Sequence, residues 1–247
     1  MNPTGRFADR AVDYAAARPS YPAAAIEAVF DGLGDDVVVA DLGAGTGIST
    51  RLLATRASLV YAIEPNANMR AVAEPAPRIR SISGTAEETG LEEASIDLVT
   101  AFQAFHWFDA PAALSEMTRI LRPGGRAALV YNERDEADPF TAGYGAILRR
   151  AATDDTEQRR VRARLAFAAH RGWRTYRELV FRNSQRQDLE GLLARARSSS
   201  YLPKDGPAGA ALADELRALF AAHERDGTVT MHLATLVAIG ESGADGG

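Results

Sequence analysis

Short, continuously apolar runs alternate with longer stretches of helical spacing along the first half of the chain. The apolar runs are rich in β-branched residues and predict strands at residues 37–40, 59–63, 79–82, 96–100 and 126–131. The stretches between them predict helices at 46–55, 66–73 and 111–121, and the sequence Arg122-Pro-Gly-Gly125 predicts a turn after the last of these. Strands that are apolar throughout and alternate with helices are typical of a parallel sheet buried on both faces. The pattern therefore predicts an α/β fold.

The pattern changes after the fifth predicted strand. Residues 140–170 are almost entirely of helical character and rich in Ala and Arg. Beyond them the sequence predicts a strand at 179–183, helices at 188–198 and 210–226, and a last strand at 228–239. No linker rich in Gly, Pro or Ser divides the chain, so residues 1–247 are expected to form one domain. The helical stretch is interpreted as an insertion between the fifth and sixth strands that lies over the carboxyl edge of the sheet.

Composition and charge narrow the classes of protein. Hydrophobic residues make up 46% of the chain and charged residues 25%, which is typical of a globular protein. The net charge of −5 argues against a nucleic-acid partner, because such proteins need basic surface to neutralise phosphates. Arginine pairs at 149–150 and 159–160 are interleaved with acidic residues and are interpreted as a solvated helix face. The chain contains no cysteine, which excludes disulfides, thiolate metal sites and a cysteine nucleophile.

The distribution of apolar residues also bears on location. No run approaches the roughly 20 apolar residues of a membrane span. The first residues lack the apolar segment of a secretory signal. A cytoplasmic protein without a membrane partner, either a monomer or a homodimer, is therefore expected.

A glycine-rich loop joins the first predicted strand to the first predicted helix. Gly43, Gly45 and Gly47 allow a tight turn and a close approach of the backbone to a ligand at the start of a helix. Dinucleotide-binding folds use a similar loop, but their G-x-G-x-x-G pattern would need glycine at the position of Ile48. Asp41, before the first glycine, would repel a pyrophosphate and attract an ammonium group. The loop therefore favours a ligand with an amino-acid end over a dinucleotide.

Three further groups of residues each follow a predicted strand. Glu64 ends the second strand, where a carboxylate can accept hydrogen bonds from both hydroxyls of a ribose. Glu87 follows the third strand and could meet the amino group of an adenine. The fourth strand leads into an aromatic segment in which His106 could act as a general base or orient a nucleophile. Open α/β sheets bind ligands at the carboxyl ends of their strands, so these side chains are expected at one site.

These motifs together resemble the class I methyltransferases that use S-adenosylmethionine (SAM), specifically the type 11 methyltransferase domain. The resemblance rests on the order and spacing of Asp41-x-Gly-x-Gly-x-Gly47, Glu64, Ala86-Glu87, Gln103-Ala-Phe-His-Trp-Phe108 and Leu121-Arg-Pro-Gly-Gly125. Segments 7–14 and 18–22 are similar to the N-terminal lid of the same group, and the match extends over about residues 7–133.

The resemblance implies a fold and a division of the chain. The fold is α/β, with a Rossmann-like seven-stranded sheet of order 3-2-1-4-5-7-6, the last strand antiparallel, helices on both faces and a helical cap after strand five. The single methyltransferase domain (1–247) would comprise an N-terminal helical lid (1–35), a SAM-binding core (36–135), a helical cap on the substrate side (136–205), a closing helix and strand (206–240) and a disordered tail (241–247).

The resemblance also implies a site for SAM, which methyl transfer converts to S-adenosylhomocysteine (SAH). Asp41 and the glycine loop would hold the methionine part, Glu64 the ribose and Glu87 the adenine, while Gln103 would lie beside the sulfonium and Arg18 near the cofactor carboxylate. The expected cofactor-binding residues are Tyr14, Arg18, Asp41, Gly43, Ala44, Gly45, Gly47, Glu64, Pro65, Thr85, Ala86, Glu87 and Gln103. Position along the chain places on the substrate side Phe105, His106, Trp107, Tyr131, Asn132, Phe140, Tyr144 and Tyr201.

Several of these residues have a purely structural alternative. Asp41 could cap the helix, and Glu87 could belong to a charged surface loop. Tyr14 and Arg18 could simply pack against each other at helical spacing. His106 could be an inert, hydrogen-bonded member of an aromatic wall. No spacing of histidines or carboxylates predicts a metal site.

The sequence thus predicts methyl transfer from SAM to an O-, N- or C-nucleophile of a small molecule, by in-line displacement at the methyl carbon. A SAM-binding protein without catalysis would carry the same cofactor motifs. An NAD(P)-dependent oxidoreductase is the other alternative, although the chain lacks a Tyr-x-x-x-Lys pair.

Overall fold

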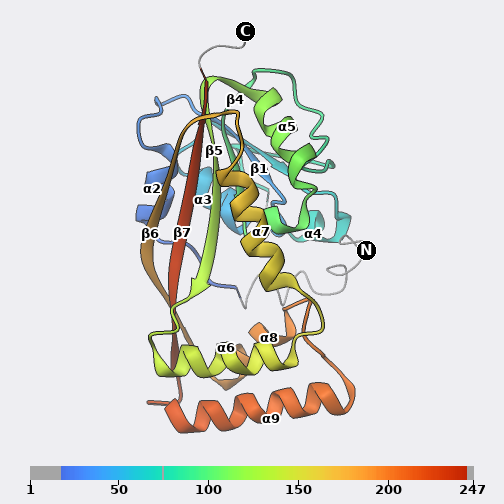
Figure 1. Cartoon of the computed structure of the whole chain (residues 1–247), viewed down its shortest axis with the longest axis vertical. Helices are drawn as coiled ribbons and strands as arrows, with labels where there is room; N and C mark the ends of the chain where they lie inside the picture. Colours follow the sequence, from blue (N-terminus) through green and yellow to red (C-terminus); the bar gives the residue numbers. More distant parts are fainter. Residues whose placement is uncertain (1–17, 74, 244–247) are drawn as a thin grey trace.

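The structure, a computed structural model, describes residues 18–73 and 75–243. Within these residues, seven strands form one sheet in the order β3-β2-β1-β4-β5-β7-β6 (Figure 1). Strands β1 to β5 run parallel, and β7 is antiparallel to both of its neighbours. The strand order and the antiparallel last strand predicted from the sequence are confirmed. The strands are β1 (Val38–Leu42), β2 (Leu59–Ile63), β3 (Ile79–Ile82), β4 (Ile96–Phe102), β5 (Leu121–Arg134), β6 (Trp173–Gln187) and β7 (Val229–Ser242).

Helices cover both faces of this sheet. The described helices are α2 (Ala23–Phe30), α3 (Ile48–Leu53), α4 (Ala67–Val72), the short 3₁₀ helix η2 (Phe105–Trp107), α5 (Ala110–Ile120), α6 (Pro139–Ala151), α7 (Thr156–Ala168), α8 (Leu189–Arg197) and α9 (Gly206–His223). One core packs α5 and α7 against the sheet, and a second packs α2 and α3 against its other face. Successive residues of one strand enter different cores, Val39 the second and Ala40 the first, which explains the continuously apolar strands. Of the helices described, none combines the length and apolar character of a membrane-spanning segment.

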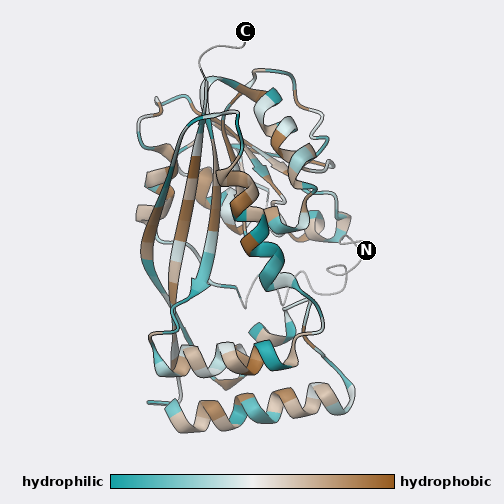
Figure 2. Cartoon of the chain, in the orientation of Figure 1, coloured by the Kyte–Doolittle hydropathy of each residue, from teal (hydrophilic) through white to brown (hydrophobic). Residues whose placement is uncertain are grey.

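A third core lies at the carboxyl end of β5. It joins α6, α8 and α9 to the beginning of β7, through residues such as Leu193, Leu216 and Met231. Figure 1 shows these helices together beyond the lower end of β5. In Figure 2 that end of β5 and the first half of α7 are hydrophilic. The fold therefore brings polar residues from the sheet and from the helical cap to one place.

Three elements differ from the sequence prediction. The turn expected at residues 122–125 lies inside β5, as an excursion of the backbone between the pairs Ile96–Leu121 and Leu98–Arg126. The edge strand β6 extends well beyond the predicted 179–183. The prediction was too short because most side chains of this strand alternate between exposed and partly buried, so the strand does not form an apolar run. Strand β7 continues through Ser242, so residues 241 and 242 belong to the sheet rather than to a disordered tail.

Candidate active site

Two connected cavities lie at the carboxyl ends of β1, β2, β4 and β5. The larger, of 290 Å³, carries two glutamates and no lysine or arginine among its described lining residues, and we call it the carboxylate chamber. The smaller, of 130 Å³, carries four arginines and no acidic residue among those described, and we call it the arginine chamber. The two chambers share five lining residues: Gly43, Gly45, Phe102, Gln103 and Trp107.

The glycine loop lines both chambers where they lie next to each other. Gly43, Gly45 and Gly47 have φ values of 68°, 56° and 80°, a backbone region in which other residues are strained. A Cβ atom on Gly43 would lie 2.7 Å from the Cβ of Ala104, so this position also needs glycine for space. Gly43 and Gly45 line both chambers and Ala44 lines the arginine chamber, whereas Gly47 lines neither and precedes α3.

Glu64 lies in the wall of the carboxylate chamber, next to Pro65. Its Oε2 accepts a hydrogen bond from the amide of Gly45 and its Oε1 one from the amide of Asn66, both at 2.9 Å. Burial raises the pKa of this carboxyl, although the two amides and Arg70 act in the opposite direction. Because each carboxylate oxygen can accept a second hydrogen bond, Glu64 fixes the loop and keeps acceptor capacity for a ligand.

The segment after β3 supplies another wall of the carboxylate chamber. Thr85, Ala86 and Glu87, the residues expected at the adenine, all line it. The Oε1 of Glu87 accepts a hydrogen bond from the amide of Asp109 at 2.8 Å. Glu87 thereby connects this segment to the start of α5 instead of standing alone in a charged surface loop.

Asp41 does not reach either chamber. Its side chain is fully buried, and its oxygens accept hydrogen bonds from the hydroxyls of Ser49, Thr50 and Thr100 at 2.7 to 2.9 Å. Burial raises its pKa to about 6, against the effect of those three hydroxyls. The predicted contact with an ammonium group is therefore corrected: the carboxylate joins β1 to β4 and to the first turn of α3 from inside the protein.

Gln103 separates the two chambers and has an unusual backbone. Its φ is 54°, a conformation that costs a residue other than glycine about 1–3 kcal/mol and is kept only where the surroundings impose it. The Nε2 of Gln103 donates to the carbonyl of Asn132 at 3.1 Å, and its Oε1 accepts from Arg160 at 2.7 Å. The side chain is thus held at the junction by β5 on one side and α7 on the other.

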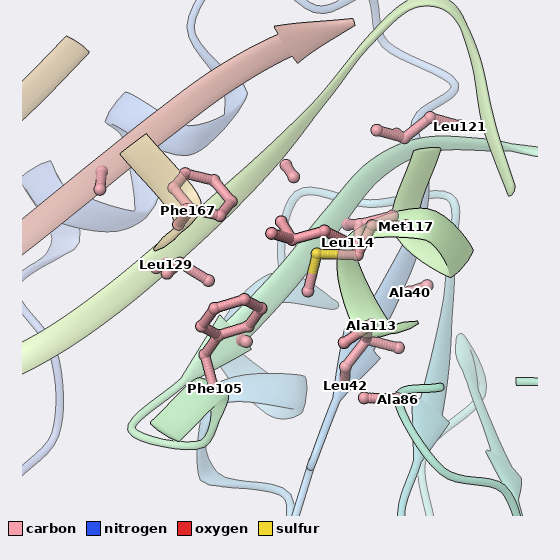
Figure 3. Close-up of a cluster of buried hydrophobic side chains, with 14 of the residues drawn as sticks. Ala40, Leu42, Ala86, Phe105, Ala113, Leu114, Met117, Leu121, Leu129 and Phe167 are labelled. Atoms are coloured by element: carbon pink, nitrogen blue, oxygen red, sulfur yellow. The ribbon is translucent and has the colours of Figure 1, made fainter. Parts of the chain in front are cut away.

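The aromatic segment after β4 divides between site and core. His106 and Trp107 line the arginine chamber. Phe105 and Tyr131 line neither chamber, contrary to the sequence prediction, because both are fully buried. Phe105 packs at right angles to Phe167 in the core beneath α5 and α7 (Figure 3). The hydroxyl of Tyr131 lies 3.5 Å from His106 Nδ1, so it supports the imidazole from behind the chamber.

The helical cap contributes the remaining polar wall. Asn132, Tyr144 and Tyr201, which the sequence predicts on the substrate side, line the arginine chamber. Phe140, on the same helix as Tyr144, is instead buried in the core of the cap. The side chains come from β5, from α6 and from the segment after α8.

Three of the four arginines of this chamber are functional candidates that the sequence did not reveal. Arg134 ends β5, Arg160 lies on α7 and Arg195 lies on α8, and all three line the chamber. The interpretation of the pair at 159–160 as a solvated helix face was wrong for Arg160, whose side chain is only 16% exposed. Nothing in the local sequence distinguishes these arginines from the surface arginines at 149–150.

Burial and the neighbouring arginines set the charge state of His106. Burial and the positive charges of Arg160, Arg159 and Arg18 lower the pKa of its imidazole well below 6.5. The imidazole of His106 is therefore neutral at pH 7, with an unprotonated ring nitrogen, and is a weaker base than an ordinary histidine.

Of the two lid residues predicted to bind the cofactor, Arg18 lines the arginine chamber and donates to the carbonyl of Ser198 at 3.4 Å. Tyr14 lies outside the described residues, as do the other residues up to 17 of the predicted lid (1–35). Acidic residues 154, 155 and 157 each pair with an arginine, and the described part of the chain holds no group of three or more His, Asp or Glu suited to a metal ion.

Comparison with known proteins agrees with this architecture. A family model described as a methyltransferase domain matches residues 40–129. An uncharacterised methyltransferase of Mycobacterium tuberculosis is 42% identical over 138 residues, 56% of this chain and 56% of that protein. An uncharacterised methyltransferase-like protein of Schizosaccharomyces pombe is 34% identical over 152 residues, 60% of this chain and 59% of that protein. The chain thus spans little more than half the length of these relatives.

A solved structure has the same fold over nearly the whole chain. A proposed type II methyltransferase from Anaeromyxobacter dehalogenans superposes with a TM-score of 0.64 at 24% identity, covering 92% of this chain and 97% of that one.

Proposed function

We propose that the chain, whose residues 40–129 match a family model described as a methyltransferase domain, binds SAM and transfers its methyl group to a small molecule. The observation that carries the proposal is the pair of chambers that meet at the glycine loop, one with Glu64 in its wall and the other with polar groups from the cap. SAM has an adenosine part and a charged amino-acid part, which suits two joined compartments of different character.

The residues present fit this cofactor. Glu64 has acceptor capacity beyond the amides of Gly45 and Asn66, as the hydroxyls of a ribose require. The hydroxyl of Thr46, next in the loop, is buried without a hydrogen-bond partner among the described residues and borders the arginine chamber. Thr46 and Arg18 would hold the amino-acid end, and Thr85, Ala86 and Glu87 the adenine.

When bound, SAM supplies a methyl group on a positively charged sulfur; the acceptor forms a bond to the methyl carbon while the carbon–sulfur bond breaks and its electron pair stays on sulfur, which gives SAH. The chain contributes alignment and the exclusion of water. Gln103 and Trp107, where the chambers join, would border the path of transfer. His106, neutral at pH 7, would take the proton from an oxygen or nitrogen acceptor. Residues 136–205 would form the substrate side of the site.

Calorimetric titration with SAM, SAH and NADH in parallel tests the proposal. We expect SAM and SAH to bind with dissociation constants in the range of about 1 µM to 1 mM, and NADH not to bind. Binding of NADH alone would favour an oxidoreductase instead, and binding of none of the three would overturn the proposed cofactor. Transfer of labelled methyl from SAM to a panel of small molecules would then separate an enzyme from a SAM-binding protein without catalysis.

A further inference from the structure

The arginine chamber has an electrostatic character opposite to that of the chain as a whole. Four arginines line it and no described lining residue is acidic, although the protein carries a net charge of −5. Tyr144 and Tyr201 also line the chamber. Positive charge is therefore concentrated in an enclosed space.

Arg195 is the most unusual of the four. Its side chain is 9% exposed, and its guanidinium donates to the neutral Oε1 of Gln185 at 2.5 Å. Within residues 18–73 and 75–243, no carboxylate lies at ion-pair distance from it, and its charged neighbours are Arg18 and Arg134. A buried charge that lacks an opposite charge is costly, and the neighbouring positive charges add to the cost. An anion in the chamber would remove that cost.

Arg134 and Arg160 have carboxylate partners, but these carboxylates do not line the chamber. Arg134 pairs with Glu157 and, at 3.5 Å, with Glu136, and Arg160 pairs with Glu133 at 3.2 Å. Glu157 and Glu133 line a separate groove on the protein surface, and their side chains are 36% and 35% exposed. The Nε of Arg160 is buried without a hydrogen-bond partner among the described residues. These pairs hold the two guanidinium groups in place, and their carboxylates line the groove and not the arginine chamber, where Arg195 is the arginine without an acidic partner among the described residues.

The carboxylate of SAM accounts for only part of this charge. Arg18 and the loop residues Gly45 and Thr46 suffice for one carboxylate, whereas Arg134, Arg160 and Arg195 extend the positive wall to β5, α7 and α8. His106 also borders this wall, so a ligand held by the arginines would lie beside the candidate base.

We infer that the methyl acceptor carries an anionic group, a carboxylate or a phosphate, and that Arg195, with Arg134 and Arg160, binds it in the arginine chamber. The inference rests on the proposed function, since it names the substrate class of that site. Guanidinium groups bind both anions through paired N–H donors, so the chemistry they share is what the chamber recognises.

The test is calorimetric titration of the SAH-saturated protein with acetate, malonate and inorganic phosphate. Saturation with SAH fills the place of the cofactor carboxylate, so any anion that binds reports a second site. We expect at least one of the three to bind, and Arg195→Gln to weaken its binding about tenfold or more, as expected for the loss of a charge-assisted hydrogen bond. Tighter binding of malonate than of phosphate would identify a carboxylate acceptor, and the reverse order a phosphate.

Arg195→Lys and Arg217→Gln are the controls. Lysine keeps the charge and should retain part of the affinity even if the glutamine variant fails to fold, whereas Arg217, exposed on α9 and paired with Asp214, should have no effect. The inference is overturned if none of the anions binds to the SAH complex, or if binding does not depend on residue 195. Failure of SAH itself to bind would instead overturn the proposed function, and the same anions titrated without SAH would then decide the nature of the chamber.

Discussion

The carboxylate chamber and the arginine chamber share Gly43, Gly45 and Gln103, yet they are built in different ways. The first is made by a few segments that directly follow β1, β2, β3 and β4, and backbone amides hold its key side chain, Glu64. The second depends on side chains from β5 and three cap helices, and arginine Arg195 is buried there without an opposite charge. The construction of the carboxylate chamber suits a cofactor that all members of a family share. The construction of the arginine chamber suits a substrate that differs from one enzyme to another.

His106 offers the largest effect that would separate the two chambers. Since its imidazole is neutral at pH 7 and borders only the arginine chamber, His106→Gln should lower methyl transfer about 100-fold or more and leave SAH affinity within twofold. The measurement pairs labelled-methyl transfer, scored on an acceptor found by screening, with SAH titration. His232→Gln, at an exposed histidine of β7, should change neither quantity. Undiminished transfer would leave His106 as part of an inert wall.

Glu64 provides the converse test, with a smaller expected effect. Glu64→Gln removes the charge that accepts from Gly45 and would bind the ribose hydroxyls, so SAH affinity should fall about tenfold. Because burial raises the pKa of this carboxyl, the wild-type protein should also lose SAH affinity as the pH falls through the acid range, and the variant should not. Glu88→Gln, at an exposed neighbour of Glu87, is the matched control. Unchanged affinity in Glu64→Gln would mean that the cofactor does not occupy the carboxylate chamber.

The different construction of the two chambers also explains why the sequence predicted residues of the carboxylate chamber better than those of the arginine chamber. The strand order was implied by the family resemblance, and Gly43, Gly45 and Glu64 could be placed at one edge of the sheet because they follow strands whose neighbours are fixed by the fold. Gly43 and Gly45 have positive φ values, and the glycines that such a backbone conformation favours can be recognised in the sequence.

The arginine chamber leaves no such trace. Arg134, Arg160 and Arg195 are far apart in the chain and meet only after the cap has packed, so their surroundings decide whether an arginine is solvated or buried. The prediction also failed for Phe105 and Tyr131, because an aromatic residue at the end of a strand can point into a core or into a cavity with no change in the local pattern. Burial separates these cases, and burial is a property of the whole fold.

Asp41 belongs to the cofactor motif, but the fold buries its side chain outside both chambers. Its substitution should therefore have the smallest effect on SAH binding. The carboxylate lies in neither chamber, so Asp41→Asn should leave SAH affinity within twofold. Its effect should appear in stability instead. The pKa of Asp41 is raised from 3.8 to about 6, so the folded state favours the protonated form, and this contribution to stability is present below pH 3.8 and lost as the pH rises through 6. At about 1.4 kcal/mol for each pH unit, the loss amounts to about 3 kcal/mol.

Urea unfolding of the wild-type protein and of Asp41→Asn at pH 4 and pH 7 measures this contribution. Asparagine does not ionise, so the variant should lack the decrease of about 2 kcal/mol in unfolding free energy that the wild-type protein shows between these two pH values. Glu116 is a reference of opposite sign, because Arg119 lowers its pKa to about 2 and its contribution to stability is lost toward low pH. A tenfold loss of SAH affinity in Asp41→Asn, with no change in the pH dependence of stability, would return Asp41 to the role that its place before the glycine loop suggests, and would mean that the loop rearranges when the cofactor binds.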